Sequence, residues 1–292
     1  MKHPINPLVD CVFKKLLGSE ENRDLTCHFL NAVFVDSLTV PLAEVTLLNP
    51  YNEKSALDDK LSIVDVKARD EAGRTFQIEV QLSTRGGLPQ RMLYNWAQLY
   101  VDQLGSGGAY LSLKPVLSVW ILDGALPGIP SAPHHRFHIG LGLNSMYLDR
   151  ECMIHALELP AWQTRQVGSE IERWIRFLRE GAGLDPEHLP PWMNTGEMHK
   201  AMEVLVEFSE REKALDLYRR RQDYRRVIAG YELDLEEAKE AKAQALAAKE
   251  GERAAKEQAL AAKEAERAAK EQALAEVEAL RARLRAAGLE EG

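Results

Sequence analysis

Residues 61–82, which read LSIVDVKAR-DEAG-RTFQIEVQL, decide the fold of this chain. Polar and apolar residues alternate in the last segment, so the pattern predicts a strand with two different faces. The apolar face carries Phe76, Ile78, Val80 and Leu82, and the polar face carries Thr75, Gln77, Glu79 and Gln81. The central DEAG suits a type I turn followed by a glycine in the left-handed region. The stretch therefore predicts an antiparallel hairpin.

The turn also predicts the register of this hairpin. If Asp70 pairs with Arg74, counting back along both strands sets Asp65 opposite Glu79 on the same face. Directly opposed side chains have Cβ atoms about 4.5–5.5 Å apart, and like charges repel at that distance. Two opposed carboxylates make sense where a divalent cation lies between them, so the pair makes the chain a candidate metal-dependent nuclease.

The same pattern has a simpler interpretation, which the pattern alone favours. An amphipathic hairpin ordinarily has one wet face, so Asp65 and Glu79 could both be solvated there, with Lys67 and Arg69 neutralising them. The register is also an inference, and a slip of one residue would move Glu79 off the site.

Length and composition bound the class of protein. At 292 residues the chain can hold one large domain or two small ones. It has no run of about 18 apolar residues, so we expect no membrane span, and its first residues lack the apolar segment of a signal peptide. Cys11, Cys27 and Cys152 are odd in number and far apart, which predicts neither a disulfide framework nor a zinc site. We therefore expect a cytoplasmic protein.

The charge is evenly spread and acidic. Residues 231–292 carry 15 acidic and 11 basic side chains, which leaves 30 and 26 in residues 1–230, so each part has a net charge of −4 and the chain −8. This balance argues against extensive binding to a nucleic-acid backbone, which draws on clustered Lys and Arg, although a small local basic patch could suffice.

Hydrophobic periodicity predicts an α/β domain with a mixed sheet, followed by helices. The nearly continuous apolar run at 115–123 is typical of a strand buried on both faces, and a helix before it implies a parallel crossover. The other predicted strands lie at 44–49 and near 134–141 and 151–158, and the predicted helices lie at 7–17, 21–34, 89–104, 169–180, 195–208 and from 210 onward.

The C-terminal region is repetitive. Residues 244–272 repeat with a period of 14 residues, but only Leu246, Leu260 and Leu274 add apolar bulk, which is too little for a strong coiled-coil seam. Glu252–Lys256 and Glu266–Lys270 are i,i+4 pairs in the favourable order. We expect a long helix that is either solvent-exposed or weakly self-associating.

Several segments occur in an order that resembles a known family. They are PLVDCVFK at 7–14, DV at 65–66, IEVQ at 78–81, RMLY at 91–94, YLSLKPV at 110–116 and ELP at 158–160. Over residues 4–240 the chain resembles the Rpn recombination-promoting nucleases, a transposase-like branch of the PD-(D/E)xK superfamily. The resemblance implies a restriction-endonuclease-like core, which we place at 1–165, with a helical region at 166–230 and an Ala/Glu/Lys-rich helical tail at 231–292.

The resemblance also implies a site and a reaction. It assigns catalytic positions to Asp65, Glu79 and Gln81, and it assigns Asp10, on the first helix, with Asp65 and Glu79 to Mg²⁺ binding. Hard oxygen ligands suit this cation, which promotes attack of water on a phosphodiester. The expected protein is a Mg²⁺-dependent DNA endonuclease associated with recombination or mobile elements.

Gln81 stands where the wider superfamily has Lys, and Gln supplies no charge. Lys67 or Arg91 could supply it, or both could be ordinary surface charges. The expected contacts to DNA are Arg91 and the basic stretch with Arg219, Arg220 and Arg221, although a solvated helix face explains that stretch equally well.

Other interpretations stay open. His134 and His138 lie four residues apart, but on a strand-like segment without a third ligand, so polar strand residues are favoured over a zinc site. The protein could be a catalytically inactive relative that binds DNA, or a partner through its tail, or a purely structural protein. Cleavage of both DNA strands ordinarily needs two sites, which favours a homodimer.

Overall fold

The hairpin forms with the predicted turn and register. In the computed structural model, β2 (Asp65–Asp70) runs antiparallel to β3 (Thr75–Gln81), and Asp65 lies opposite Glu79. Gly73 has φ 87° in the turn. The structure describes residues 5–49, 65–82, 84, 86–138, 140–141, 146–147, 151–163 and 166–286, so residues 61–64 of the predicted strand and the side chain of Asp65 lie outside its described part.

An ion pair closes the hairpin at its turn. The backbone N–H of Arg74 donates to Oδ1 of Asp70 at 2.8 Å, and its Nε donates to Oδ2 at 2.6 Å. The two side chains are only 13% and 5% exposed. Arg74 thus binds both carboxylate oxygens of Asp70 across the turn, and this contact fixes the strand register locally.

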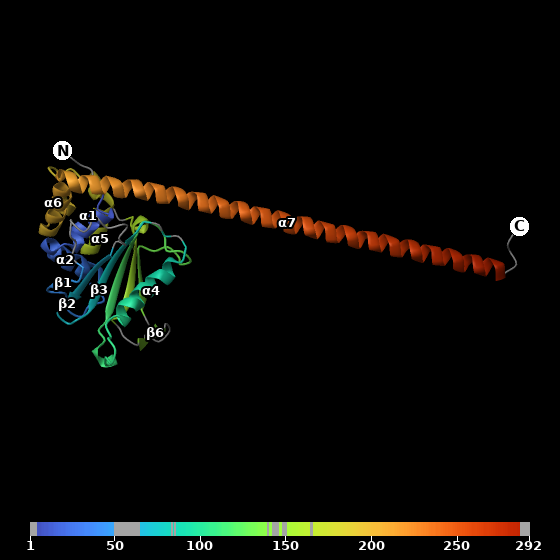
Figure 1. Ribbon diagram of the computed structural model, residues 1–292, viewed down its shortest axis with the longest axis horizontal. Coiled ribbons are helices and arrows are strands. Elements are labelled where there is room, and N and C mark those ends of the chain that lie inside the picture. Colours follow the sequence, from blue (N-terminus) through green and yellow to red (C-terminus); the bar gives the residue numbers. More distant parts are fainter. Residues whose placement is uncertain are drawn as a thin grey trace. The chain divides into compact units, whose positions relative to one another are not determined.

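The hairpin belongs to a six-stranded mixed sheet with the order β1-β2-β3-β4-β8-β5 (Figure 1). Strand β3 pairs in parallel with β4 (Val116–Leu122), and β4 pairs in parallel with β8 (Met153–Glu158), whereas the outer pairings are antiparallel. The outermost strands are β1 (Val45–Leu47) and β5 (His134–His138), and a separate small sheet joins β6 (Gly140–Leu141) to β7 (Met146–Tyr147). The predicted α/β class with a mixed sheet is confirmed.

Helices begin and end close to the predicted positions. Ser169 and Thr195 cap α5 and α6, each accepting a hydrogen bond from a backbone N–H of the first turn. The helices are α1 (Asp10–Gly18), α2 (Arg23–Val33), α4 (Leu88–Val101), α5 (Glu170–Glu180), α6 (Gly196–Glu210) and α7 (Glu212–Ala286), with short 3₁₀ turns at Glu20–Asn22, Tyr110–Ser112, Leu159–Ala161, Gly181–Gly183 and Pro191–Met193.

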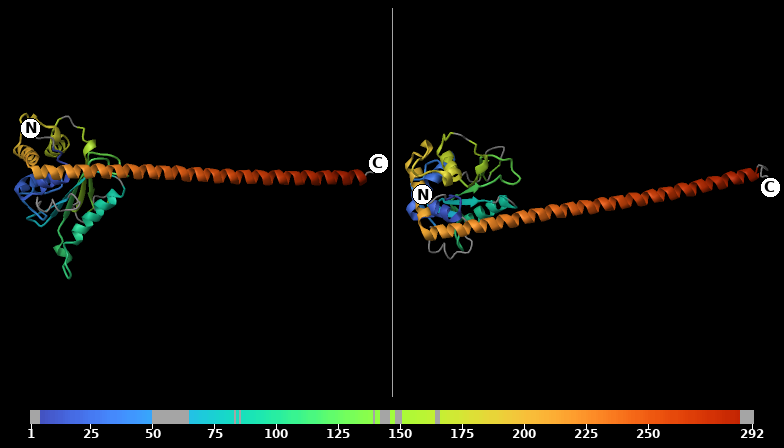
Figure 2. Two further views of the ribbon diagram at one scale, coloured as in Figure 1. Left: turned by 45° about the horizontal axis from the view of Figure 1, so that its top comes forward. Right: turned by 90° about the horizontal axis from the view of Figure 1, so that it is seen from above.

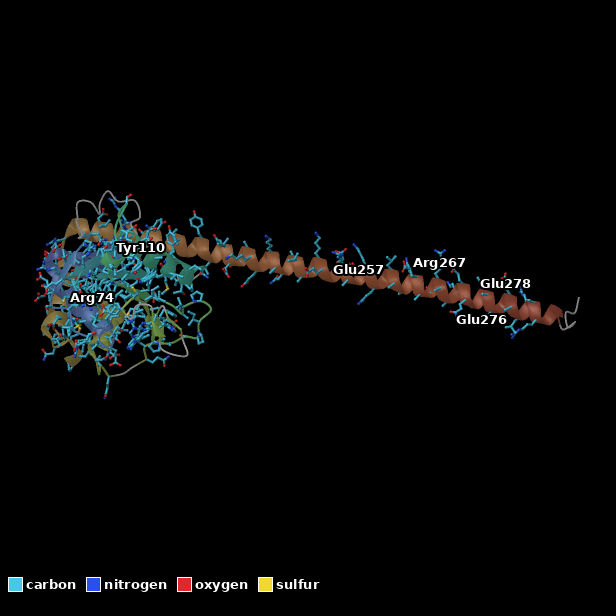
Figure 3. All side chains as sticks on the ribbon, turned by 90° about the horizontal axis from the view of Figure 1, so that it is seen from below. Arg74, Tyr110, Glu257, Arg267, Glu276 and Glu278 are labelled. Carbon is cyan, nitrogen blue, oxygen red and sulfur yellow. The ribbon has the colours of Figure 1, made fainter. Side chains whose placement is uncertain are left out.

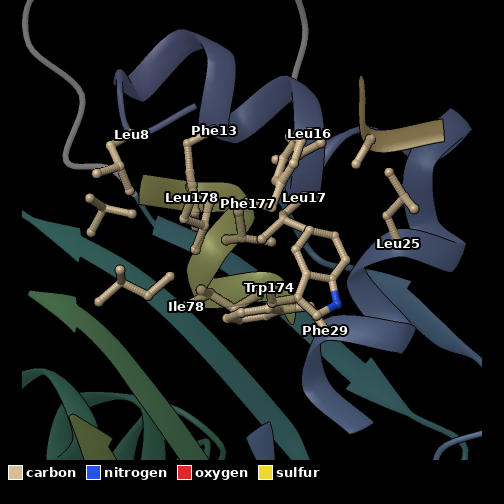
Figure 4. Close-up of a cluster of buried hydrophobic side chains, with 14 of the residues drawn as sticks. Leu8, Phe13, Leu16, Leu17, Leu25, Phe29, Ile78, Trp174, Phe177 and Leu178 are labelled. Carbon is tan, nitrogen blue, oxygen red and sulfur yellow. The ribbon is translucent and has the colours of Figure 1, made fainter. Parts of the chain in front are cut away.

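The sheet separates two hydrophobic layers (Figures 1 and 2). On one face, the apolar side of β3 packs against α1, α2, α5 and α6. Figure 4 shows Ile78 facing Phe13 of α1 and Trp174 and Phe177 of α5. The other face is covered by α4, whose Leu88, Met92 and Trp96 pack on Val116, Trp120 and Leu122 of β4.

This second layer shows that the interpretation of a wet polar face is wrong for β3. Thr75, Gln77 and Glu79 are each only 3% exposed. The alternation correctly predicts two different faces, but the polar face is buried along β3 instead of facing solvent. Glu79 is therefore a buried acid.

The chain divides into two compact units, Met1–Tyr224 and Arg225–Gly292, so α7 begins in the first unit and makes up the described part of the second. The predicted i,i+4 pairs form, with Lys256–Glu252 at 2.7 Å and Lys270–Glu266 at 2.9 Å. Figure 3 shows side chains such as Glu257 and Arg267 projecting from this helix. Leu246, Leu260 and Leu274 are 58–66% exposed. Among the described residues, no helix combines the length and apolar character needed to cross a membrane.

We predict that Gly73→Ala lowers the free energy of unfolding by about 1 kcal/mol, because an L-residue is strained at this positive φ. Gly196→Ala is the matched control: Gly196 begins α6 without a positive φ and has no atom within 4 Å of the added Cβ. There the substitution should stabilise the protein by a few tenths of a kcal/mol. Urea unfolding of both variants measures the difference, and equal effects would contradict the assigned turn.

Candidate functional site

The candidate site lies on the covered face of the sheet, toward the end of β3. Glu79 is flanked in register by Asp65 on β2 and by Trp120 on β4. Its carboxylate Oε1 accepts a hydrogen bond of 2.9 Å from Nε2 of Gln77, two residues earlier on the same face. Burying a carboxylate costs free energy unless hydrogen-bond donors or cations compensate its charge. The hydrogen bond from Gln77 is one such compensating contact for Glu79.

Two further buried polar groups extend this contact. Oγ of Ser118 donates to Oε1 of Gln77 at 3.2 Å, and Nε1 of Trp120 donates to Oγ of Ser118 at 3.0 Å. Sequence reasoning missed Gln77, Ser118 and Trp120 as parts of the site. Gln77 was visible on the polar face of the strand, but Ser118 and Trp120 stood in an apolar run that indicated only a buried strand.

The structure brings a cation to Gln81. Arg91, near the start of α4, donates a hydrogen bond to Oε1 of Gln81, and its guanidinium carbon lies 5.4 Å from the ring centroid of Trp120. Gly86 and Gly87 adopt positive φ just before α4, which lets the chain turn from β3 into the helix. The guanidinium of Arg91 is therefore in direct contact with the side chain of Gln81.

Asp10 is engaged by a distant residue. It is the first residue of α1, and its Oδ2 lies 3.3 Å from Nε of Arg221 on α7, with the two side chains 16% and 14% exposed. Close by in sequence, the hydroxyl of Tyr218 accepts a hydrogen bond from the backbone N–H of Asn6 at 3.1 Å. The first turns of α7 thus dock on the N-terminal segment.

The predicted basic stretch is accordingly divided. Arg221 turns inward to Asp10, whereas Arg219 is exposed and Arg220 is exposed with Asp216 at 2.7 Å. The structure therefore assembles Glu79, Gln81 and Arg91 and sets the backbone of Asp65 beside them. It pairs Asp10 with Arg221. Among the side chains that it describes, which exclude that of Asp65, no three His, Cys, Asp or Glu residues gather as metal ligands.

His134 of β5 contacts a histidine of β8. Nε2 of His134 lies 3.0 Å from Nδ1 of His155. Burial is the largest cause that lowers the pKa of His155 to about 2 and that of His134 to about 4. Nε2 of His155 has no hydrogen-bond partner among the described residues. This neutral pair favours the interpretation as strand residues.

Glu158 is a second buried acid, at the end of β8. It accepts hydrogen bonds from the backbone N–H of Leu126 at 2.7 Å and from Ser131, and lies 2.9 Å from Nε2 of His135. Burial raises the pKa of Glu158, but these donors outweigh burial and hold it below its usual value. Its contacts tie the loop before β5 to the sheet.

The comparisons with known proteins agree with this architecture. A family model described as PD-(D/E)XK nuclease family transposase matches residues 7–229. The match covers most of the chain, which therefore belongs to this family. No curated protein and no solved structure matches the chain.

We predict that Arg221→Gln lowers the free energy of unfolding by about 1–2 kcal/mol, because it leaves the poorly exposed carboxylate of Asp10 without its ionic partner. Arg220→Gln is the control, since its pair with Asp216 is 74% and 57% exposed. An exposed pair of this kind contributes less than about 1 kcal/mol. Urea unfolding at fixed pH compares the two variants, and equal losses would argue against a structural role of the Asp10 contact.

We also predict that stability falls on acidification below pH 6.5. His155 binds its proton near pH 2 in the folded protein, against an ordinary value of 6.5, so between these values only the unfolded chain is protonated. Each such histidine lowers the free energy of unfolding by up to about 1.4 kcal/mol per pH unit in this window.

The measurement is urea unfolding from pH 7.5 to 4.5. His155→Gln should flatten the slope, whereas His188→Gln, at a side chain that is 81% exposed, should leave it unchanged. An unchanged slope in His155→Gln would show that other groups cause the acid sensitivity.

Proposed function

We propose that this member of the PD-(D/E)XK nuclease transposase family is a Mg²⁺-dependent endonuclease that hydrolyses phosphodiester bonds in DNA. The observation that supports it most is the position of Glu79. This acid is 3% exposed and lies in register with the backbone of a second acid, Asp65. Two acids opposed in register repel each other unless a cation compensates their charge.

The donor chemistry fits a hard divalent cation. Asp65 and Glu79 offer carboxylate oxygens from two adjacent strands, and Mg²⁺ is bound by a small number of such oxygens. When bound, the cation would activate water and offset the charge that develops at the phosphate. Asp10 is the further ligand that the family implies, and its pair with Arg221 must open or be shared before it can contribute.

The basic side chains have separate proposed roles. Arg91 places a guanidinium at Gln81, where it can bind a phosphate oxygen and supply the charge that Gln lacks. Arg219 and Arg220 are exposed at the start of α7 and are proposed to contact the DNA backbone. Because the 45 acidic side chains outnumber the 37 basic ones, we expect DNA affinity to depend on the site rather than on a broad basic surface.

One observation favours a second function. The Asp10–Arg221 pair reduces the negative charge that the site offers a cation, and Gln81 lacks the positive charge with which a Lys would act on water or phosphate. A catalytically inactive relative that binds DNA, or a partner through its helical tail, is therefore the alternative proposal. The nuclease and the inactive DNA-binding relative differ in metal-dependent cleavage but not in DNA binding.

Plasmid nicking with Mg²⁺ tests the catalytic proposal. Asp65→Asn and Glu79→Gln keep the side-chain shape but remove the charge, and each should slow nicking at least about 100-fold. Glu71→Gln removes an exposed charge in the turn of the same hairpin and should nick at the wild-type rate. Thermal melting of each variant confirms that it is folded.

Each outcome is decisive. Equal nicking by wild type and both site variants would remove the catalytic claim. DNA binding without any nicking would establish the inactive relative instead.

A further inference from the structure

Trp120 connects the two signature residues of β3 through different parts of its side chain. It is completely buried in β4, in register with Glu79. Its indole N–H begins a hydrogen-bond chain that ends at Glu79, and its ring face lies beneath Arg91, which binds Gln81. We propose that Trp120 is a positioning residue of the site, an inference that rests on the proposed metal-dependent function.

The hydrogen-bond chain has only one consistent direction. An indole N–H can only donate, so Oγ of Ser118 must accept from Trp120 at 3.0 Å. Ser118 then gives its own hydrogen to Oε1 of Gln77 at 3.2 Å. The amide nitrogen of Gln77 is left to face Glu79, and it donates to Oε1 at 2.9 Å.

Because the chain is buried, its direction determines the orientation of the Glu79 carboxylate. Gln77 and Glu79 are 3% exposed and Ser118 and Trp120 are fully buried, so water does not readily replace a lost partner. If the amide of Gln77 were flipped, its oxygen would face the carboxylate and two acceptors would oppose each other. The chain therefore fixes the orientation of one carboxylate oxygen of Glu79 from outside the site.

The second connection acts through the ring. The guanidinium carbon of Arg91 lies 5.4 Å from the centroid of Trp120, within the range of a cation–π contact. The same guanidinium donates to Oε1 of Gln81. The ring thus supports the cation that holds Gln81, while the N–H on its edge orients Glu79.

The chain offers a matched control in Trp96. This residue lies in the same hydrophobic layer, is 7% exposed, and donates its indole N–H to the carbonyl oxygen of Val116 at 2.8 Å. Trp96→Phe and Trp120→Phe therefore each remove one buried indole hydrogen bond from the same layer. Only the second interrupts the chain to Glu79.

The experiment measures binding of Mn²⁺ alone to the full-length chain by isothermal titration calorimetry. Outer hydrogen-bond partners of metal ligands typically contribute 10- to 100-fold in affinity, so Trp120→Phe should bind Mn²⁺ about 10-fold more weakly than wild type. Ser118→Ala breaks the same chain without altering the indole and should cause a similar loss. Trp96→Phe should stay within about twofold of wild type, since its indole bond leads to no ligand.

A double variant tests whether the two losses of Mn²⁺ affinity are additive, which distinguishes a positioning role from a general effect on packing. Because Trp120 and Ser118 act through one chain, the double variant should bind Mn²⁺ no more weakly than either single variant. Thermal melting of each variant confirms that binding is measured on folded protein.

The outcomes separate this inference from the proposed function. Mn²⁺ binding and nicking by wild type with unchanged affinity in Trp120→Phe and Ser118→Ala would overturn the positioning role alone. An equal loss in Trp96→Phe, or additive losses in the double variant, would also overturn it, because general packing would then explain the effect. Failure of the wild type to bind Mn²⁺ would overturn both.

Discussion

The register of β2 against β3 is the constraint on which the candidate site depends. Side chains of a strand alternate between faces, so a slip of one residue would set Asp65 opposite Ile78 or Val80, which lie on the other face from Glu79. The bidentate contact between Asp70 and Arg74 and the positive φ of Gly73 fix the pairing at the turn. Five residues further along β3, the same register sets the two acids opposite each other.

Burial then determines what Glu79 can do. A carboxylate on an exposed face is stabilised by water and mobile ions. One that is only 3% exposed depends on neighbouring protein groups for this stabilisation. Gln77 supplies one donor to Glu79, and Arg91 places a cation beside Gln81. The absence of a Lys at position 81 therefore does not leave this end of β3 without positive charge, because the following helix brings a guanidinium to it.

The sequence contained the local features of this site but not the contacts made over long separations. Alternation and turn chemistry are short-range, so the hairpin and the pairing of Asp65 with Glu79 could be predicted from 22 residues. The burial of the polar face could not, because it depends on the crossover that pairs β4 with β3 and packs α4 on β4. From the sequence alone, Ser118 is a small residue in an apolar strand. Its role depends on its hydrogen bond to Gln77 on the neighbouring strand β3, which is distant in sequence.

Long-range contacts join the start of α7 to the N-terminal helix. Arg221 pairs with Asp10, and Leu217 and Tyr218 are buried in the same hydrophobic cluster as α1. These contacts place the first turns of α7 within the unit that holds the site, in agreement with a family match that extends to residue 229. Beyond that unit the helix satisfies its charges along its own surface, through pairs such as Arg253–Glu257 and Arg267–Glu271 at 3.1 Å. One helix thus begins as part of a folded core and continues as a segment stabilised by its own local pairs.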